Sequence, residues 1–256
     1  MNPIMETQAI TMRFGGLVAV NEFSMKIGAN DLIGLIGPNG AGKTTIFNMI
    51  TGHYLPSEGK ILFNGESISG KEPAVITQGG IARTFQNIRL FKDLSVLDNI
   101  RIAGHSRLSY GLASSIFRTK AFHEEENKLR AEAFELLKIM KLEHRVDSLA
   151  KNLPYGEQRR LEIARALATH PKLLLLDEPV AGMNPNETKE LTGLIRWVRD
   201  HFKIAVLLIE HDMKLVMEVC ESIYVVDHGE LIAHGGPKDI QNNPKVIEAY
   251  LGTTEV

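Results

Sequence analysis

The 256-residue sequence contains one cysteine, Cys220, so no disulfide can form within the chain. Its formal net charge is −2, and no excess of positive charge favours nucleic acid as a partner. The longest apolar runs, at residues 173–176 and 204–209, are far shorter than the roughly 20 residues of a membrane-spanning helix. The start of the sequence lacks the basic and apolar regions of a signal peptide. These absences predict a globular protein of a reducing, cytosolic compartment.

Predicted strands and helices alternate along most of the chain. Residues 8–14 and 20–27 alternate apolar and polar positions around Gly15-Gly16, which predicts an antiparallel hairpin. Further strands, mostly preceded by helical patterns, are predicted at residues 31–36, 172–177, 204–209 and 223–227. Residues 90–160 show no strand pattern, and apolar positions recur there at helical spacing. The sequence predicts an α/β fold with a mostly parallel core sheet, an N-terminal antiparallel β-subdomain and an all-helical insert.

A glycine-rich loop separates the strand at residues 31–36 from a helix predicted at residues 43–51. It reads G-P-N-G-A-G-K-T-T and matches the phosphate-loop pattern G-x-x-x-x-G-K-[ST]. Glycines let the backbone curl and point its N–H groups at phosphate oxygens, and the helix start adds its positive dipole end. Lys43 supplies charge for the outer phosphates, and the Thr44 hydroxyl suits Mg²⁺. The predicted phosphate-binding residues are Gly37, Pro38, Asn39, Gly40, Ala41, Gly42, Lys43, Thr44 and Thr45.

Two adjacent carboxylates, Asp177 and Glu178, follow the four leucines at residues 173–176. Open α/β sheets bind ligands beyond the carboxyl ends of their strands. At that edge Asp177 would hold the shell of Mg²⁺ through water, and Glu178 would polarise the attacking water. Asp-Glu after a strand is also typical of a solvated cap, and the phosphate loop is what favours catalysis here.

Two more polar residues are candidates for the same edge of the sheet. His211 follows the apolar run I-A-V-L-L-I-E and is placed to donate to a γ-phosphate. Gln86, in R-T-F-Q-N, is a candidate to reach Mg²⁺ and the water through its amide oxygen. Taken alone, a histidine in such a place is more often structural, and a loop glutamine usually has no function.

Together these residues resemble the ATP-binding-cassette (ABC) superfamily over essentially the whole chain. The phosphate loop, Gln86, the block L-P-Y-G-E at residues 153–157, the D-E-P strand end and His211 occur in that family's order. The resemblance implies a composite site in which ATP on one phosphate loop is covered by the signature turn of a second cassette. It also implies that Phe14 stacks on adenine and that Asn184 lies in a loop crossing the dimer interface.

The same resemblance implies the domain organisation. Residues 1–256 would form a single cassette with a RecA-like, P-loop NTPase core. Residues 1–90 and 160–256 would form that catalytic core, and about residues 90–160 would form the helical subdomain.

The signature turn departs from the usual L-S-G-G-Q of the family, because it consists of Pro154, Tyr155, Gly156 and Glu157. Pro154 offers no hydroxyl for a γ-phosphate, whereas the Gly156 N–H and the following helix start remain available in trans. The crossing loop reads A-G-M-N where aspartate is commoner, so Asn184 keeps the hydrogen bonding without the charge.

Two sequence motifs are similar to those of ATPases of branched-chain amino-acid importers, namely P-Y-G-E-Q-R-R-L-E-I-A-R-A-L and N-N-P-K-V-I-E-A-Y-L-G. The resemblance implies an ATPase that drives import with ATP and Mg²⁺ as cofactors. Its implied partners are transmembrane permease subunits, a second ABC ATPase subunit and, indirectly, a substrate-binding protein. The implied location is peripheral, on the cytoplasmic face of a bacterial inner membrane.

Three alternatives use the same chemistry. The ATPases of urea or amide importers share much of these motifs, and so do the ATPases of lipopolysaccharide or lipid exporters. The exporter ATPases more often keep the serine and double glycine of the signature turn. A soluble ABC ATPase acting on translation or DNA is disfavoured, because such proteins usually contain two cassettes, long coiled coils or zinc-binding cysteines.

Residues 99–123 contain no acidic residue and four Lys or Arg residues, namely Arg101, Arg107, Arg118 and Lys120. One interpretation is a solvated loop whose following Glu124-Glu125-Glu126 forms the first turn of a helix and complements its dipole. The other is a basic segment that faces the membrane or a transporter loop. Leu90 and Phe91 are candidates either for a groove that receives a partner's cytoplasmic helix or for a buried structural role.

Overall fold

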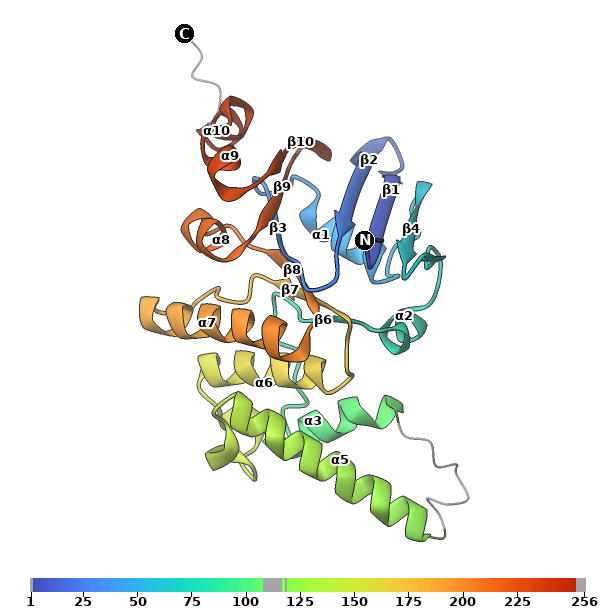
Figure 1. The fold of residues 1–256 in the computed structure, drawn as a ribbon, viewed down its shortest axis with the longest axis vertical. Coiled ribbons are helices and arrows are strands. Elements are labelled where there is room, and N and C mark those ends of the chain that lie inside the picture. The colour runs from blue at the N-terminus through green and yellow to red at the C-terminus, as the bar shows by residue number, and fades with distance from the viewer. Residues whose placement is uncertain (1, 108–116, 118, 252–256) are drawn as a thin grey trace. The chain divides into compact units, whose positions relative to one another are not determined.

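In a computed structural model, the chain divides into two compact units. The structure describes residues 2–107, 117 and 119–251 (Figure 1). Unit 1 comprises Met1–Arg83, Lys172–Pro179 and Thr192–Val256, and unit 2 comprises Thr84–Pro171 and Val180–Leu191. Helix α7 (Pro185–Phe202) contributes residues to both units.

Unit 1 contains two β-sheets among its described residues. The first is antiparallel with the order β2-β1-β4-β5, and the second has the order β10-β9-β3-β8-β7-β6. The second sheet is parallel except where β10 pairs with β9. The strands are β1 (Met5–Phe14), β2 (Leu17–Ile27), β3 (Leu32–Ile36), β4 (Glu58–Phe63), β5 (Glu66–Ser67), β6 (Ile81–Arg83), β7 (Leu173–Asp177), β8 (Ala205–Ile209), β9 (Ser222–Asp227) and β10 (Glu230–Gly235).

The central strands β3, β7 and β8 are buried along their whole length. Continuous apolar runs of this kind are typical of parallel strands that are covered on both faces. In the β7–β8 register, Asp177 pairs with Ile209, so the two strands end at the same edge of the sheet. That edge is where the chain places the polar residues that follow each strand.

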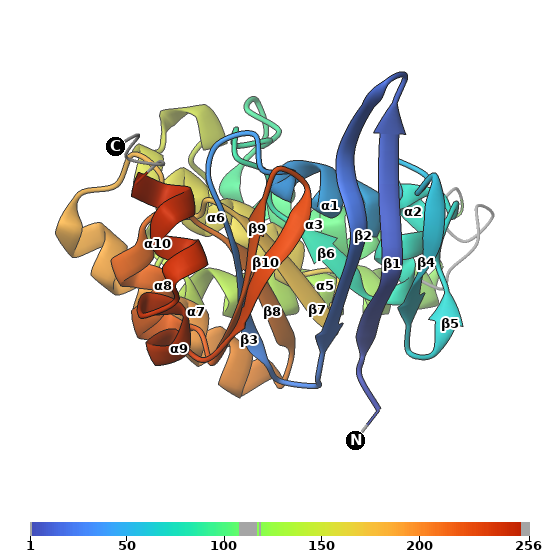
Figure 2. The ribbon, with the colours of Figure 1, turned by 90° about the horizontal axis from the view of Figure 1, so that it is seen from above.

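Helix α1 (Lys43–Ile50) links the two sheets through the hydrophobic core. Its Ile46, Phe47, Met49 and Ile50 are buried in one cluster with residues of both sheets. Figure 2 shows β10 beside β2, with α1 behind the strands. The other helices of unit 1 are α2 (Pro73–Gly79), α8 (Met213–Val219), α9 (Pro237–Gln241) and α10 (Pro244–Leu251).

The described part of unit 2 is helical. Helices α3, α5 and α6 pack against one another, and a single antiparallel bridge joins Ser95 to Leu149. Its elements are α3 (Val96–Gly104), η1 (His105–Arg107), α5 (Lys120–Ile139), η2 (Glu143–Arg145), η3 (Ala150–Asn152) and α6 (Tyr155–Leu167).

The hairpin, the strands and the helices predicted from periodicity are confirmed, with ends that differ by a few residues. The short or irregular strands β4, β5, β6 and β10 carry no such pattern and were not predicted. Among the described residues, no helix is both long enough and apolar enough to cross a bilayer.

Candidate functional site

The phosphate loop joins the buried end of β3 to the first turn of α1. Gly37, Gly40 and Gly42 have φ values of 155°, 81° and 101°, which disfavour residues with a side chain. A Cβ on Gly37 would lie 2.0 Å from the carbonyl oxygen of Val226, whereas a Cβ on Gly40 would meet no atom within 4 Å. Gly37 is therefore needed for packing, and Gly40 borders open space where a ligand can approach the backbone.

The turn between β9 and β10 supports the phosphate loop from behind. The amide of Gly229 donates to the carbonyl of Ala41 over 3.1 Å, and its carbonyl accepts from Asn21 over 2.8 Å. A Cβ on Gly229 would lie 2.8 Å from the Ala19 carbonyl, at a φ of 83°. This close backbone contact fixes the loop through the carbonyl of Ala41.

Lys43 is buried and points back along its own loop. Its Nζ donates to the carbonyl oxygens of Gly37 and Pro38 over 2.6 and 2.8 Å. Burial lowers the pKa of Lys43, while the nearby carboxylates of Glu178 and Asp177 act in the opposite direction. The loop cation and the two strand-end carboxylates therefore belong to one electrostatic site.

Glu178 has a left-handed backbone with a φ of 46°, which is uncommon for a residue with a side chain. Its amide donates to the carbonyl of Ile209 over 2.9 Å, and this bond ties the end of β7 to the end of β8. His211 is exposed, and its Nδ1 lies 3.8 Å from Oε1 of Glu178. Backbone strain at such a position is typical of functional sites.

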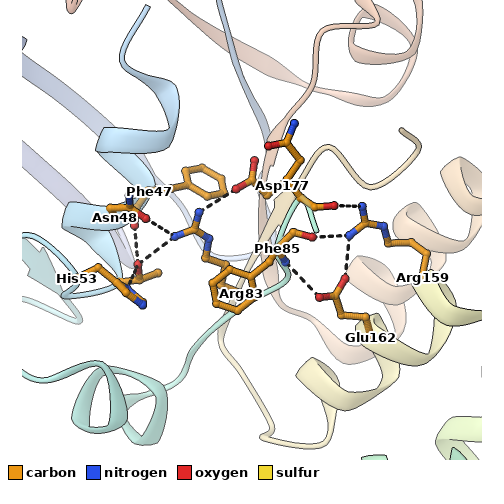
Figure 3. Close-up of polar contacts among 10 residues, drawn as sticks. Phe47, Asn48, His53, Arg83, Phe85, Arg159, Glu162 and Asp177 are labelled. Carbon is orange, nitrogen blue, oxygen red and sulfur yellow. Dashed lines mark hydrogen bonds and ion pairs between the residues drawn. The ribbon is translucent and has the colours of Figure 1, made fainter. Parts of the chain in front are cut away.

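Asp177 is held by an arginine that sequence reasoning missed. Arg83 Nη2 donates to Asp177 Oδ2 over 2.8 Å, and Arg83 Nη1 donates to Asn48 Oδ1 over 2.7 Å (Figure 3). The guanidinium also lies 5.4 Å from the ring centre of Phe47. Arg83 thus ties the end of β7 to α1. In the sequence, the role of Arg83 was indicated only by its place two residues before Phe85-Gln86 in R-T-F-Q.

Phe14 lies at the end of β1 with 43% of its surface exposed. Its ring meets that of Tyr54 edge to face, with centroids 5.3 Å apart. Tyr54 was not singled out in the sequence, because it lies in an irregular segment after α1. The pair presents a partly exposed aromatic surface that suits a planar base.

Tyr250 is a third residue that sequence reasoning missed. Its phenol oxygen is buried beside the backbone amide of Gly37, and burial raises the pKa of this group to about 12. The C-terminal helix α10 therefore contacts the first residue of the phosphate loop.

Unit 2 contains Gln86, the signature turn and Asn184. Gln86 is exposed, and its backbone carbonyl accepts from Arg159 over 2.9 Å. Asn184 Oδ1 accepts from the amides of Asn186 and Glu187, both over 3.0 Å, so this side chain caps the start of α7. A cap is a structural use for Asn184 that its sequence context did not indicate.

The signature turn starts α6, with Pro154 as its N-cap residue. Tyr155 is exposed beside Gly182, whose Cβ would lie 3.6 Å from the Tyr155 ring. Glu157 Oε2 accepts from Arg145 Nε over 3.2 Å. The carboxylate that stands in this turn is therefore neutralised from η2.

The basic segment is largely paired within unit 2. Arg101 Nη2 lies 2.8 Å from Glu126, and Arg107 Nη2 lies 2.8 Å from Glu132. Helix α5 starts at Lys120, so Glu124-Glu125-Glu126 lies beyond its first turn and the predicted dipole role for that acidic run is wrong. Arg118 lies outside the described residues.

Leu90 is half-buried, and Phe91 is 48% exposed. The guanidinium of Arg165 lies 5.6 Å from the ring centre of Phe91. The expectation of a groove at these residues remains a prediction.

The predicted site residues thus fall into two sets. Unit 1 places the phosphate loop, Asp177, Glu178 and His211 at one sheet edge, and it also contains Phe14. Unit 2 contains Gln86, Asn184 and the signature turn. No group of three or more His, Cys, Asp or Glu side chains suited to a metal occurs in the described part of the chain.

Comparison with known proteins identifies this arrangement. Residues 20–181 match the family model described as ABC transporter. The structure resembles the ADP conformation of an ATP-binding cassette of an ABC transporter, with a TM-score of 0.85 and 34% identity over 98% of this chain and 100% of that one. A nucleotide-free cassette gives a TM-score of 0.83 with the same identity, over 98% and 99% of the two chains. The chain belongs to the ABC transporter family and is an ATP-binding cassette.

Within that family, it belongs with the ATP-binding proteins of branched-chain amino acid transport. Residues 230–256 match the model described as branched-chain amino acid ATP-binding cassette transporter. The chain is 46% identical to the high-affinity branched-chain amino acid transport ATP-binding protein LivG of Escherichia coli K12, over 98% of both chains. It is equally similar to BraF of Pseudomonas aeruginosa, with 46% identity over 98% of both chains. The fold class and the resemblance predicted from the sequence are confirmed.

Proposed function

We propose that this chain is the ATP-hydrolysing subunit of an ABC importer for branched-chain amino acids. The observation that supports the solute class most directly is the 46% identity to LivG over 98% of both chains. The solute would cross the membrane through separate permease subunits, and this chain would supply the free energy of ATP hydrolysis. It would work at the cytoplasmic face of the membrane, with a substrate-binding protein as an indirect partner.

Phosphate binding would use the loop from Gly37 to Thr45. The open space beside Gly40 and the amides at the start of α1 fit an anion, because they offer N–H donors and the positive end of a helix dipole. Lys43 would exchange the carbonyls of Gly37 and Pro38 for phosphate oxygens. Phe14 would stack on the adenine, with its ring orientation set by Tyr54.

Mg²⁺ would be held by Thr44, by Gln86 and, through water, by Asp177. These residues offer oxygen ligands, which suit Mg²⁺, and phosphates and waters would complete its shell because the described residues form no protein-only metal cage. When bound, Mg²⁺ neutralises charge on the phosphates during transfer. Arg83 would keep the Asp177 carboxylate in place.

Hydrolysis would depend on Glu178. Its carboxylate takes a proton from the attacking water as the new bond to the γ-phosphorus forms and the bond to the leaving oxygen of ADP breaks. His211, 3.8 Å from Glu178, would donate to the γ-phosphate.

A second cassette would complete the site. Pro154, Tyr155, Gly156 and Glu157 would face the γ-phosphate bound to the partner cassette, and Asn184 would cross the interface. The γ-phosphate then favours the closed pair, and hydrolysis releases it. The second cassette is either another copy of this chain or a sister ATPase.

The test of the chemistry is the isosteric substitution Glu178→Gln. We expect ATP turnover to fall by ~10²–10⁴-fold, the usual range for a lost general base, while ATP binding and ATP-dependent dimerisation persist. Glu58→Gln, an exposed carboxylate on β4, is the matched control and keeps full turnover. Normal hydrolysis by Glu178→Gln contradicts the assignment of the base.

The test of the solute is uptake by membrane vesicles that contain this chain and its co-purifying permease subunits. We expect ATP-dependent uptake of labelled leucine, isoleucine and valine, which the Glu178→Gln chain abolishes. Uptake of urea or a short amide in place of leucine would reassign the solute and leave the ATPase assignment intact.

A further inference from the structure

The segment that carries Gln86 lies outside the helices and strands, and side chains of α6 bind its backbone on both sides of that residue. Arg159 Nη1 donates to the carbonyl of Phe85 over 2.6 Å, and Arg159 Nη2 donates to the carbonyl of Gln86 over 2.9 Å. Glu162 Oε1 accepts from the amides of Phe85 and Arg89 over 3.3 and 3.2 Å. Figure 3 shows Arg159 and Glu162 reaching this backbone from one helix.

Arg159 and Glu162 also bind each other. Their side chains are 0% and 1% exposed, and Nη1 of Arg159 lies 2.8 Å from Oε2 of Glu162. A buried ion pair is a weak source of stability, because an apolar pair of similar volume often serves the fold equally well. The pair supplies hydrogen-bond donors and acceptors to a backbone segment that lacks regular secondary structure. Because both side chains are buried, the pair satisfies backbone groups that water does not satisfy there.

The same helix begins at the signature turn. Arg159 lies four residues after Tyr155, which is about one turn along α6. The backbone around Gln86 and the signature turn are therefore attached to opposite ends of one short helical stretch. Both belong to unit 2.

We propose that Arg159 and Glu162 are positioning residues for ATP hydrolysis, which hold the Gln86 segment in fixed relation to the signature turn. This inference rests on the proposed function. Gln86 would sense the nucleotide bound to this chain, and the signature turn would meet the nucleotide bound to the second cassette. Because the pair links them, Gln86 and the signature turn move as a single body. Neither Arg159 nor Glu162 touches ATP in this scheme.

The chain offers a matched anchor for comparison. Asn99 in α3 is fully buried, and its amide group accepts from Phe91 N over 2.9 Å and donates to Phe91 O over 3.0 Å. Asn99 thus holds the end of the same segment through hydrogen bonds from α3. Substitution of Asn99 therefore tests the order of the segment separately from the attachment of the segment to α6.

The first measurement is amide hydrogen exchange in the nucleotide-free chain. The double variant Arg159→Met with Glu162→Leu removes both charges and leaves no buried ion unpaired, so the fold is retained. We expect exchange at the amides of Phe85 and Arg89 to rise by about tenfold or more, while amides of β7 and β8 are unchanged. Glu162→Gln keeps only one acceptor oxygen beside the buried Arg159 cation, so exchange at these amides should rise in this variant as well. Unchanged exchange at Phe85 and Arg89 overturns the proposal.

The second measurement is steady-state ATP hydrolysis by the same variants. We expect kcat to fall by about tenfold or more in the double variant, since a misplacement of ~1 Å lowers rates by up to ~10²-fold. The affinity for ATP is unchanged because the phosphate loop belongs to unit 1. Glu162→Gln should lower kcat as well, because it loosens the same backbone, whereas Asn99→Leu should lower kcat less than the double variant does.

The outcomes separate this inference from the proposed function. Faster exchange with an unchanged kcat, or an equal loss of kcat in Asn99→Leu, shows that the pair serves only the fold and overturns the positioning role. A parent chain that hydrolyses no ATP, or whose turnover ignores Glu178→Gln, overturns the proposed function, while the exchange measurement still reports on the pair.

Discussion

The guanidinium of Arg83 donates to Oδ2 of Asp177 over 2.8 Å, and the two side chains are only 7% and 6% exposed. Arg83 is the last residue of β6 and Asp177 the last residue of β7, two parallel neighbours. The chain leaves unit 1 directly after Arg83. The ion pair therefore holds the Asp177 carboxylate, a candidate to bind Mg²⁺ through water, beside Arg83. The segment that carries Gln86 begins directly after Arg83.

Arg83→Ala should destabilise the protein far more than removal of an exposed arginine. It removes the arginine that donates to the buried Asp177 carboxylate, and breaking a buried ion pair costs about 3–5 kcal/mol. Arg13→Ala breaks the exposed pair with Glu58, 46% and 60% exposed, and should cost about 0–1 kcal/mol. Urea unfolding of the two variants measures the difference, and equal losses would show that the buried pair contributes nothing special.

Gly40→Ala and Gly37→Ala should fail in different ways. A methyl group at Gly40 meets no atom, so the fold loses only about 1–2 kcal/mol from the left-handed backbone, but the methyl enters the space where phosphate would bind. At Gly37 the methyl would lie 2.0 Å from the Val226 carbonyl and should disrupt the fold itself.

Gly65→Ala is the control for that comparison. Gly65 has a φ of 82° and open space around its Cβ, as Gly40 does, but it lies in the turn between β4 and β5. Calorimetric ATP titration should show lost binding in Gly40→Ala and normal binding in Gly65→Ala, at similar thermal stability. Normal binding in both would place the phosphates elsewhere.

The parts of the site that could be predicted are those that lie at the ends of strongly patterned elements. Lys43, Asp177 and Glu178 follow continuous apolar strands, and the backbone that positions them is local in sequence. The parallel strands that the pattern indicates also require their carboxyl ends to meet, so the electrostatic contact of Lys43 with the two carboxylates was predictable.

The contacts that could not be predicted join residues far apart in sequence. Arg83 reaches Asp177 across 94 residues, and Arg159 reaches Phe85 across 74. Arg159 and Glu162 have the i,i+3 spacing of any surface helix pair, and only the packing of α6 shows that they are buried. A charged residue in a helix pattern predicts exposure, so burial of this pair contradicts the local signal.

Cys220 should be inert in the folded protein. Burial raises the pKa of its thiol from 9.0 to about 12, and the thiolate is the reactive form. The folded state holds the proton more tightly than the unfolded state, so this contribution to stability is complete below about pH 9 and is lost as the pH rises towards about 12. Thiol labelling at pH 8 should be slow until urea unfolds the chain.

The matched measurement uses Cys220→Ala. Its free energy of unfolding should fall less steeply between pH 9 and pH 12 than that of the parent chain. Fast labelling of the native parent, or identical pH dependence of the two chains, contradicts a buried protonated thiol.

Arg145 should be needed for ATP-dependent dimerisation, because this signature turn carries a carboxylate. Glu157 lies in the first turn of α6, 14% exposed, with Arg145 Nε 3.2 Å from its Oε2. If a γ-phosphate of a second cassette approaches this turn, an unpaired Glu157 repels it, because like charges at short range in a partly buried site interact strongly. Arg145→Ala in the Glu178→Gln background should weaken ATP-dependent dimerisation by about tenfold at low salt, and added salt should reduce the loss.

Rescue distinguishes charge from packing in this contact. Adding Glu157→Gln to Arg145→Ala removes the repelling charge and should restore dimerisation, measured by sedimentation in ATP. His144→Ala is the control, since His144 Nε2 lies 3.8 Å from Glu157 Oε1 and makes no hydrogen bond there; its effect should be small. If Glu157→Gln fails to restore dimerisation, Arg145 acts by holding η2 against α6, and the altered signature then meets phosphate through its backbone alone.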